Sequence, residues 1–269
     1  MLSNSERSRF QVFIEESIGC TDVEKLKQYK TQFLAFSVTA SNENELLEAC
    51  KKDGRDLYFK GALSLAQGIS DVNYGLHSWA ITKLYYAIFY FLKSSLALRG
   101  FGLIRCGGPI HSLKIEIGQI PQKVKLPARQ HGDHKTAMAA WRNLIGEKSD
   151  ILLSQTIDDI EPYSWLMKAR ETVQYRRKTF LEPIQESYFS NLVATDISKA
   201  LDIYAKDPDP IYPFEKDNAC LALPVMRGVL SFADLSSSGQ KLTDGEKVVL
   251  NEIIGPFISS NSKVGRIFS

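Results

Sequence analysis

The sequence predicts a mostly helical fold: a helical bundle with a short β-hairpin or long loop inserted around residues 101–131 and extra helices at both ends. Long stretches place apolar residues three and four positions apart, which is typical of helices. Residues 79–98 form a segment that is apolar on nearly all sides between Leu84 and Leu92, and such a helix must be covered by other helices. The composition, 44% hydrophobic and 24% charged, is that of a globular protein.

Residues 1–70 are predicted to form two or three helices, an N-terminal segment packed on the core. Phe10 and Ile14 stand four residues apart in the first helix, and a similar apolar stripe follows in the second. In the third helix Gly54 and Gly61 interrupt the pattern, which predicts a break or a bend.

The central helix is predicted over Ser78–Arg99, and Gly100 ends it. Its uninterrupted apolar run, Leu84–Leu92, is about half of the ~20 residues that cross a bilayer. We therefore expect a buried core helix and no membrane association.

Residues 101–131 differ from the rest because they are rich in glycine and include three prolines. The stretches HSLKIEIG and QKVKLP alternate between polar and apolar residues, as short strands do. This excursion is long for a helix–helix connection, and long loops are often functional. A functional loop and a covering flap both remain open.

Two further helices carry the predicted site residues of the central bundle, which we place at residues 71–204. The first is His134–Leu144, with Asp133 as its predicted N-cap. The second is Pro162–Phe180, which begins with a proline at a permitted position and ends before Pro183.

A proline-rich break, DPDPIYP, separates this bundle from a C-terminal helical extension at residues 205–269. Within the extension, Thr243 and Glu246 match the Thr-x-x-Glu capping box, which predicts the start of a helix.

Charge and cysteine content narrow the classes of protein. The net charge of +2 gives no global attraction to nucleic acid, so any basic site must be local. The four cysteines are widely spaced and the N-terminus has no apolar signal region, so we expect reduced thiols and a cytoplasmic protein. The sequence contains no phosphate-binding loop, no dinucleotide fingerprint and no nucleophile elbow, and we expect no cofactor.

Three segments resemble the core helices of HEPN-type domains, over about residues 74–185. The segment HGDHKTAMAAW is similar to the family's second core helix, and KARETVQYRRKTFLEP is similar to its last. The segment SWAITKLYYAIFYFLKSSLALRG resembles the first, which carries a tyrosine pair, small and aromatic residues and a closing glycine. The matching residues are Tyr85, Tyr86, Ala87, Phe89, Leu96 and Gly100.

This resemblance implies an up-and-down helical bundle that forms a homodimer. Many HEPN-type domains are metal-independent ribonucleases of prokaryotic toxin–antitoxin and antiviral defence systems. Others have lost the catalytic motif and act as binding or scaffolding modules. The active members carry an arginine, four to six residues of any kind, and then a histidine.

The chain departs from that motif at its histidine. After Arg170, the expected positions hold Tyr175, Arg176 and Arg177. Histidine exchanges protons near neutral pH, whereas tyrosine has a pKa of about 10 and arginine keeps its proton. Whether the chain is an endoribonuclease therefore stays open. In a catalytic protein, Arg170 would stabilise the phosphorane, and Tyr175 or His134 would assist proton transfer.

Helical geometry places Arg170, Gln174 and Arg177 on one stripe, with Tyr175 pointing away from Arg170. Guanidinium groups on such a stripe suit phosphate oxygens. The alternative is that these arginines pair with carboxylates of neighbouring helices. The carboxylates in question are Asp158, Asp159 and Glu161.

A second basic region lies at residues 105–142, where seven Lys and Arg residues face only Glu116 and Asp133. It includes Lys135 and Arg142, and we expect both to contribute to a surface for RNA or another nucleic acid. The alternative is a solvated face that is balanced by acidic segments elsewhere.

His131 and His134 form an HxxH pair, and Cys106 and His111 lie nearby in sequence, which keeps a zinc site open. No third ligand has a suitable spacing, so we expect ordinary loop histidines and no metal.

Two hypotheses follow. In the first, the chain is a HEPN-like protein of a prokaryotic defence or toxin-type system that binds or cleaves RNA through a basic helix face. In the second, it is a catalytically inactive HEPN-like module that forms a homodimer or scaffolds a partner protein from the same operon.

Overall fold

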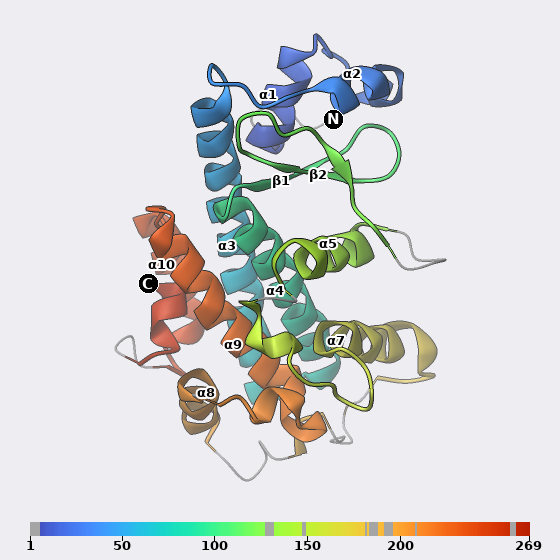
Figure 1. Cartoon of the computed structure of the whole chain (residues 1–269). Coiled ribbons are helices and arrows are strands. Elements are labelled where there is room, and N and C mark those ends of the chain that lie inside the picture. Colours follow the sequence, from blue (N-terminus) through green and yellow to red (C-terminus); the bar gives the residue numbers. More distant parts are fainter. Residues whose placement is uncertain are drawn as a thin grey trace. The chain divides into compact units, whose positions relative to one another are not determined.

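A computed structural model describes residues 6–126, 132–146, 149–180, 182, 188–190, 196–207, 209–258 and 262–269. The chain is mostly helical with a small antiparallel sheet, which confirms the predicted fold class. The longer described helices are α1 Arg9–Ser17, α2 Lys30–Ala35, α3 Glu43–Asn73, α4 His77–Leu98, α5 Asp133–Trp141, α7 Pro162–Glu171, α8 Ile197–Lys206, α9 Lys216–Ser237 and α10 Asp244–Ile254 (Figure 1).

The chain divides into two compact units that interleave along the sequence. Unit 1 comprises residues 1–57, 93–145 and 234–240, and unit 2 comprises residues 58–92, 146–233 and 241–269. Helices α3, α4 and α9 each contribute residues to both units. The predicted division at residues 70 and 204 stays a prediction.

Unit 1 is built around a small sheet. Strands β1 (Phe101–Ile104), β2 (His111–Lys114) and β3 (Gln122–Lys123) pair antiparallel in the order β1-β2-β3. The predicted hairpin within residues 101–131 is therefore confirmed, and residues 127–131 lie outside the described part. A Cβ at Gly102 would lie 2.0 Å from the ring of Phe10, so only glycine lets α1 approach β1 this closely.

Side chains of α1 hold the turn that follows β1. The Gln11 amide donates to the Arg105 carbonyl, and its oxygen accepts from the Arg105 amide, each at 2.9 Å. The apolar core of this unit includes Phe33, Leu46 and Leu113 together with Phe10 and Ile14 of α1. The N-terminal helix and the hairpin thus form one packed layer of unit 1 (Figure 1).

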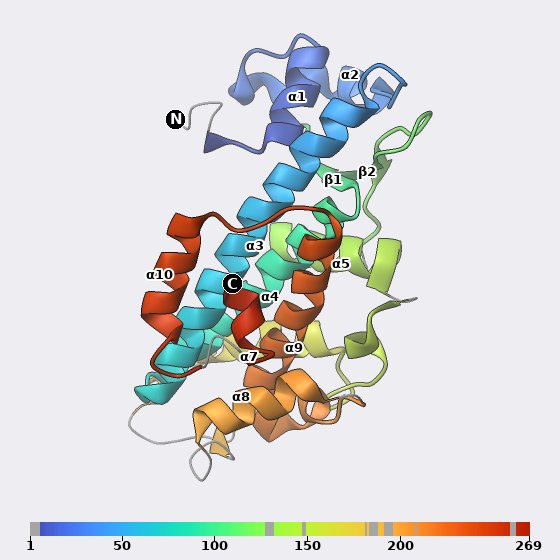
Figure 2. The same ribbon diagram turned by 90° about the vertical axis from the view of Figure 1, so that its left-hand side faces the viewer.

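Helices α3 and α4 lie side by side and antiparallel (Figures 1 and 2). Three glycines of α3 are spaced seven residues apart. Each of them faces one of three large side chains of α4, which are also seven residues apart. In unit 1, a Cβ on Gly54 would lie 2.8 Å from Leu98. In unit 2, the corresponding pairs are Gly61 with Phe91 at 2.6 Å and Gly68 with Leu84 at 2.8 Å.

The predicted break at Gly54 and Gly61 is wrong, because α3 runs without interruption from Glu43 to Asn73, while the bend stays a prediction. The glycines serve the close approach of the two helices. Burial of the facing side chains of α4 outweighs the loss of about 1 kcal/mol per glycine in helix propensity.

In unit 2, four elements meet at Gly228 of α9. Its neighbours are Leu65 of α3, Phe91 of α4 and Ile267 of the short C-terminal helix η8 (Gly265–Phe268). The Tyr58 hydroxyl donates to the Ile267 carbonyl at 2.8 Å, so the end of the chain is anchored in this core.

Helix α9 is the only described helix that is long and apolar enough to cross a membrane, and two thirds (67%) of its apolar stretch is buried. This burial is typical of a core helix of a soluble protein. The predicted core helix α4 is buried along most of its length.

All four cysteines are free and buried. Cys20, Cys50 and Cys106 belong to unit 1 and Cys220 belongs to unit 2. Burial raises the pKa of each of these thiols, which keeps them protonated and poorly nucleophilic.

The predicted N-cap of α5 is wrong. Gly132 occupies the N-cap, Asp133 is the first helical residue, and the Asp133 carboxylate instead pairs with Arg105. The capping box of α10 is confirmed, since Thr243 accepts from the Glu246 amide and the Glu246 side chain accepts from the Thr243 amide.

Thr243→Ala should lower the free energy of unfolding by about 1 kcal/mol, because the first turn of α10 loses its side-chain acceptor. Thr243→Ser keeps the hydroxyl and should stay close to the wild type. Urea denaturation followed by circular dichroism measures both variants. Equal stability of Thr243→Ala and wild type would contradict a stabilising cap.

Candidate functional site

The predicted site residues fall into both units. Arg170, Gln174, Tyr175 and Arg177 belong to unit 2, around the end of α7. Unit 1 holds the remaining three, which all lie in or just after α5: His134, Lys135 and Arg142.

The helix that carries Arg170 changes its hydrogen-bonding pattern after α7. A π-helical turn, η5, spans Thr172–Arg176, and the chain is extended at Arg177. The prediction of one regular helix over 162–180 is therefore wrong beyond Arg176. Proline at the first turn is confirmed, with Glu161 as the N-cap.

The π-helical turn brings Tyr175 to Arg170, which corrects the prediction that Tyr175 points away. In an α-helix, residues five apart face different directions, but the i to i+5 bonding of a π-helix places them nearly above one another. The Tyr175 ring centre lies 5.0 Å from the Arg170 guanidinium carbon, and the Arg170 Nη2 group donates to the Tyr175 hydroxyl at 3.2 Å.

Three tyrosine rings surround the Arg170 guanidinium. Besides Tyr175, the rings of Tyr85 and Tyr86 on α4 lie 5.6 and 5.8 Å from its central carbon. Aromatic faces attract a cation without cancelling its charge. The Arg170 Nε atom is buried and makes no hydrogen bond within the described part of the chain.

No carboxylate among the described residues neutralises Arg170. This differs from the alternative interpretation, in which the arginines pair with carboxylates of neighbouring helices. Asp158 forms an ion pair with Lys216 at 3.4 Å, and Glu161 caps the start of α7. Among the described residues, Arg170 thus presents a cation that no carboxylate neutralises and that can bind an anion.

Tyr85, one of the tyrosines next to Arg170, has a hydroxyl group that burial keeps protonated. Burial raises the pKa of Tyr85, and the nearby charge of Arg170 only partly opposes this. Tyr85 can therefore contribute its aromatic ring and a hydroxyl group that donates a hydrogen bond, but it is a poor proton acceptor at neutral pH.

Gln174 and Arg177 do not join Arg170 in the predicted stripe. The Gln174 amide donates to the Thr82 hydroxyl at 2.8 Å and to the Ser78 carbonyl at 3.3 Å, so both of its donors bind α4. Arg177 lies beyond the helical residues, in extended backbone. Of the predicted stripe, Arg170 remains.

Further aromatic side chains lie on the same helix as Tyr86. Trp79, Tyr86 and Tyr90 occupy positions 7 and 4 residues apart, which puts them on one side of α4. Tyr90 stacks on Tyr86 with ring centres 6.0 Å apart, and Trp79, which is 49% exposed, lies 6.0 Å from Phe180.

We call this set the aromatic–arginine face. Its members are Trp79, Tyr86, Tyr90, Arg170, Tyr175 and Phe180. Sequence reasoning missed it because it took the aromatic residues of α4 as core. The spacing of 7 and 4 residues was the available signal.

The backbone beyond η5 is fastened to the start of α4. The Glu182 carboxylate accepts from the Ser78 amide at 2.7 Å and from the Ser78 hydroxyl at 2.6 Å. Although burial opposes it, this hydrogen bonding lowers the pKa of Glu182. The clamp places Phe180 beside Trp79.

Unit 2 contributes one histidine, His77, and it is buried against the ring of Phe189. Burial lowers its pKa, so it is neutral at physiological pH. The residues of unit 2 thus supply no exposed imidazole for proton transfer at Arg170.

Unit 1 carries the predicted basic region. Two of its members have carboxylate partners, since Arg105 pairs with Asp133 and Lys114 pairs with Glu116. His134 and Arg142 also have interactions within the protein, and Lys135 is half-buried.

The zinc-site alternative gains no third ligand from the described residues, where no group of three His, Cys, Asp or Glu side chains could hold a metal ion. The Cys106 sulfur and His111 Nδ1 lie 3.6 Å apart in the interior of unit 1. His131 lies outside the described residues.

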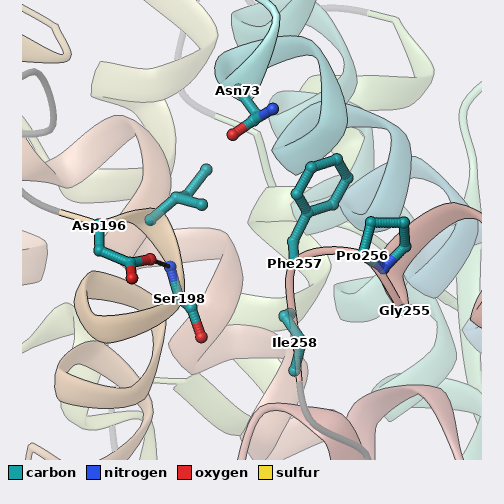
Figure 3. Close-up of a pocket in the computed structure, with 8 residues that line it drawn as sticks. Asn73, Asp196, Ser198, Gly255, Pro256, Phe257 and Ile258 are labelled. Carbon is teal, nitrogen blue, oxygen red and sulfur yellow. Dashed lines mark hydrogen bonds between the residues drawn. The ribbon is translucent and has the colours of Figure 1, made fainter.

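A pocket of about 400 Å³ opens elsewhere in unit 2 (Figure 3). The start of α8 lines one side, where the Asp196 carboxylate accepts from the Ser198 amide at 2.9 Å. Asn73 and the turn around Phe257 line the others. The described lining residues of this pocket include no lysine, arginine or histidine, so they offer no cationic side chain to an anion.

Comparison with known proteins finds no match: no family model, no curated protein and no solved structure corresponds to the chain.

Proposed function

We propose that the chain is a cytoplasmic, HEPN-like protein that binds single-stranded RNA on its aromatic–arginine face, of the kind used in prokaryotic defence and toxin-type systems. The observation that carries the proposal is the Arg170 guanidinium, which three tyrosine rings surround and no described carboxylate neutralises.

Arg170 would bind a phosphate of the RNA. Its planar donors suit phosphate oxygens, and its buried Nε atom has no hydrogen-bond partner among the residues that the structure describes. Such a buried unpaired donor is unfavourable until a ligand or a water accepts from it.

The exposed rings would stack on bases. Tyr175 is 71% exposed, and Trp79 and Phe180 are each 49% exposed. Stacking of a base on an aromatic side chain contributes about 1–3 kcal/mol and tolerates any base. Unpaired bases expose their faces, whereas those of a duplex are stacked on one another, so we propose a single strand.

Binding, not cleavage, is the activity that this face supports. Arg170 could stabilise a phosphorane, but unit 2 places no exposed histidine beside it and Tyr85 holds its proton. Incubation of labelled RNA with the protein and a chelator tests this point. Cleavage that Arg170→Ala abolishes would identify a metal-independent ribonuclease instead.

Arg170→Gln should weaken binding of a fluorescent twelve-nucleotide RNA about tenfold or more, measured by fluorescence anisotropy. Arg176→Gln is the matched control, because Arg176 is a neighbouring exposed arginine that pairs with Glu171 at 3.7 Å. Equal affinities of these two variants would contradict a phosphate site at Arg170.

Tyr175→Ala gives a second measurement at a position where folding is not at risk. It should weaken binding about 5-fold or more, because one stacking ring is lost, while Tyr175→Phe should keep most of the affinity. If Tyr175→Ala binds as wild type, the stacking part of the proposal fails. A matching DNA strand in the same assay reports the preference for RNA.

The second candidate function is the inactive module that forms a homodimer or binds a partner protein from the same operon. The exposed Trp79 and Phe180 rings favour it, because exposed aromatic groups are also common at protein interfaces. Analytical ultracentrifugation of wild type and Trp79→Ala separates the two: a dimer that dissociates in the variant would assign these rings to self-association.

A further inference from the structure

We propose that unit 1 carries a second anion site, at the turn between β1 and β2, which binds the phosphodiester backbone of a nucleic-acid strand. We call this site the lysine turn. Its members are Lys27, Lys30, Lys123 and the turn residues Cys106–Pro109. The choice of nucleic acid rests on the function proposed above, but the affinity for phosphate does not.

The chain fold brings the three lysines to the turn from different segments. Lys27 belongs to the 3₁₀ helix η2 (Val23–Tyr29), Lys30 begins α2, and Lys123 lies on β3, opposite His111 of β2. The approach of η2 to the turn is close, because a Cβ on Gly107 would lie 2.5 Å from the Lys27 Cα atom.

Gly107 makes this approach feasible. Its φ of 71° is in the left-handed region, which glycine adopts readily, and it carries no side chain to meet Lys27. A larger residue would push η2 and its lysine away from the turn.

Unneutralised charge distinguishes these lysines from most basic residues of the same unit. All three are exposed, and none of them pairs with a carboxylate in the described part of the chain. By contrast, Lys25 pairs with Asp22 at 2.9 Å and Lys51 pairs with Glu48 at 3.3 Å.

The charges felt by His111 agree with this placement. Burial lowers the pKa of His111, and the charges of Lys30 and Lys123 lower it further, while no carboxylate contributes. The same Lys30 charge acts on the neighbouring Cys106. The surroundings of the turn are therefore electropositive.

The backbone of the turn adds hydrogen-bond donors. The amides of Gly107 and Gly108 donate to no other group within the described residues, and Pro109 has no amide hydrogen. A Cβ on Gly108 would meet nothing within 4 Å, so that part of the turn is open. Free amides next to lysine ammonium groups form a recurrent phosphate-binding arrangement.

The test compares two variants of equal charge in the full chain. The first carries Lys27→Gln, Lys30→Gln and Lys123→Gln. The control carries the same change at three exposed lysines elsewhere: Lys52, Lys60 and Lys241. Both lose three positive charges, so any effect of net charge is the same in the two proteins.

Affinity for the fluorescent twelve-nucleotide RNA is measured across a series of salt concentrations. The lysine-turn variant should lose about 2 units of the slope of log affinity against log salt, because each phosphate contact on a single strand contributes about 0.7. The control should keep the wild-type slope. The same loss in both variants would overturn the proposal, because it would show an effect of net charge alone.

A second measurement separates this proposal from the proposed function. In an NMR titration with inorganic polyphosphate, the amide signals of Gly107 and Gly108 should shift in the wild type and in Arg170→Gln, but not in the lysine-turn variant. If these signals shift while the protein binds no RNA, the phosphate site stands and the RNA function falls. If polyphosphate leaves both amides unmoved, the lysine turn is not an anion site.

Discussion

Arg227→Met should lower the free energy of unfolding by about 3–5 kcal/mol, the largest effect expected from any single substitution described here. Arg227 and Asp150 form an ion pair at 3.3 Å in the interior of unit 2, where their side chains are 1% and 0% exposed. Removal of the guanidinium leaves the Asp150 carboxylate buried without its counter-charge.

The rest of the network explains why Met cannot substitute for Arg here. Asp150 also accepts from the Tyr163 hydroxyl, and Arg227 Nε donates to Ser231 at 3.2 Å. Ser231 in turn donates to the Phe91 carbonyl of α4. The network joins α7, α9 and α4 within unit 2, so its loss affects three helices together.

Urea denaturation measures the loss, and Arg176→Met is the matched control. Arg176 is 65% exposed, and its substitution should change the free energy of unfolding by less than about 0.5 kcal/mol. If Arg227→Met lowered stability by no more than the control does, the buried pair would not stabilise unit 2.

Gly61→Ala should destabilise the protein by about 1–3 kcal/mol, although alanine is the better helix former. The new methyl group would lie 2.6 Å from the ring of Phe91, which is fully buried and cannot move aside freely. Overpacking therefore outweighs the gain of up to about 1 kcal/mol in helix propensity.

Gly245→Ala is the matched control, because a Cβ on Gly245 in α10 would meet nothing within 4 Å. This variant should be as stable as the wild type or more stable by up to about 1 kcal/mol. Thermal unfolding followed by circular dichroism compares the two. A stabilising effect of Gly61→Ala would contradict the close approach of α3 and α4.

Periodicity of apolar residues was enough to predict most of the helices and the hairpin, because burial of one face leaves a regular mark on the sequence. The role of Gly54 and Gly61 was not predictable in this way. A glycine weakens a helix by itself, and its benefit depends on Leu98 and Phe91, which follow more than 25 residues later.

The candidate site was predicted in part. Arg170 and Tyr175 were identified as candidates, but their proximity depends on a π-helical turn, whose bonding pattern leaves no periodic signal. The sequence predicts that Gln174 binds a ligand. Its hydrogen-bond partners in the structure are Ser78 and Thr82 on α4. They are more than 90 residues away, so the local pattern around Gln174 does not reveal them.

The hydrogen bond between Tyr58 and Ile267 has a consequence for synthesis of the chain. These residues are 209 positions apart, and the bond fastens the core of unit 2. At a translation rate of about 5–20 residues per second, the ribosome adds Ile267 roughly 10–40 s after it adds Tyr58. Throughout that time the apolar surface around Tyr58 is incomplete on the ribosome, and such exposed apolar surface is what makes an unfinished chain prone to aggregate.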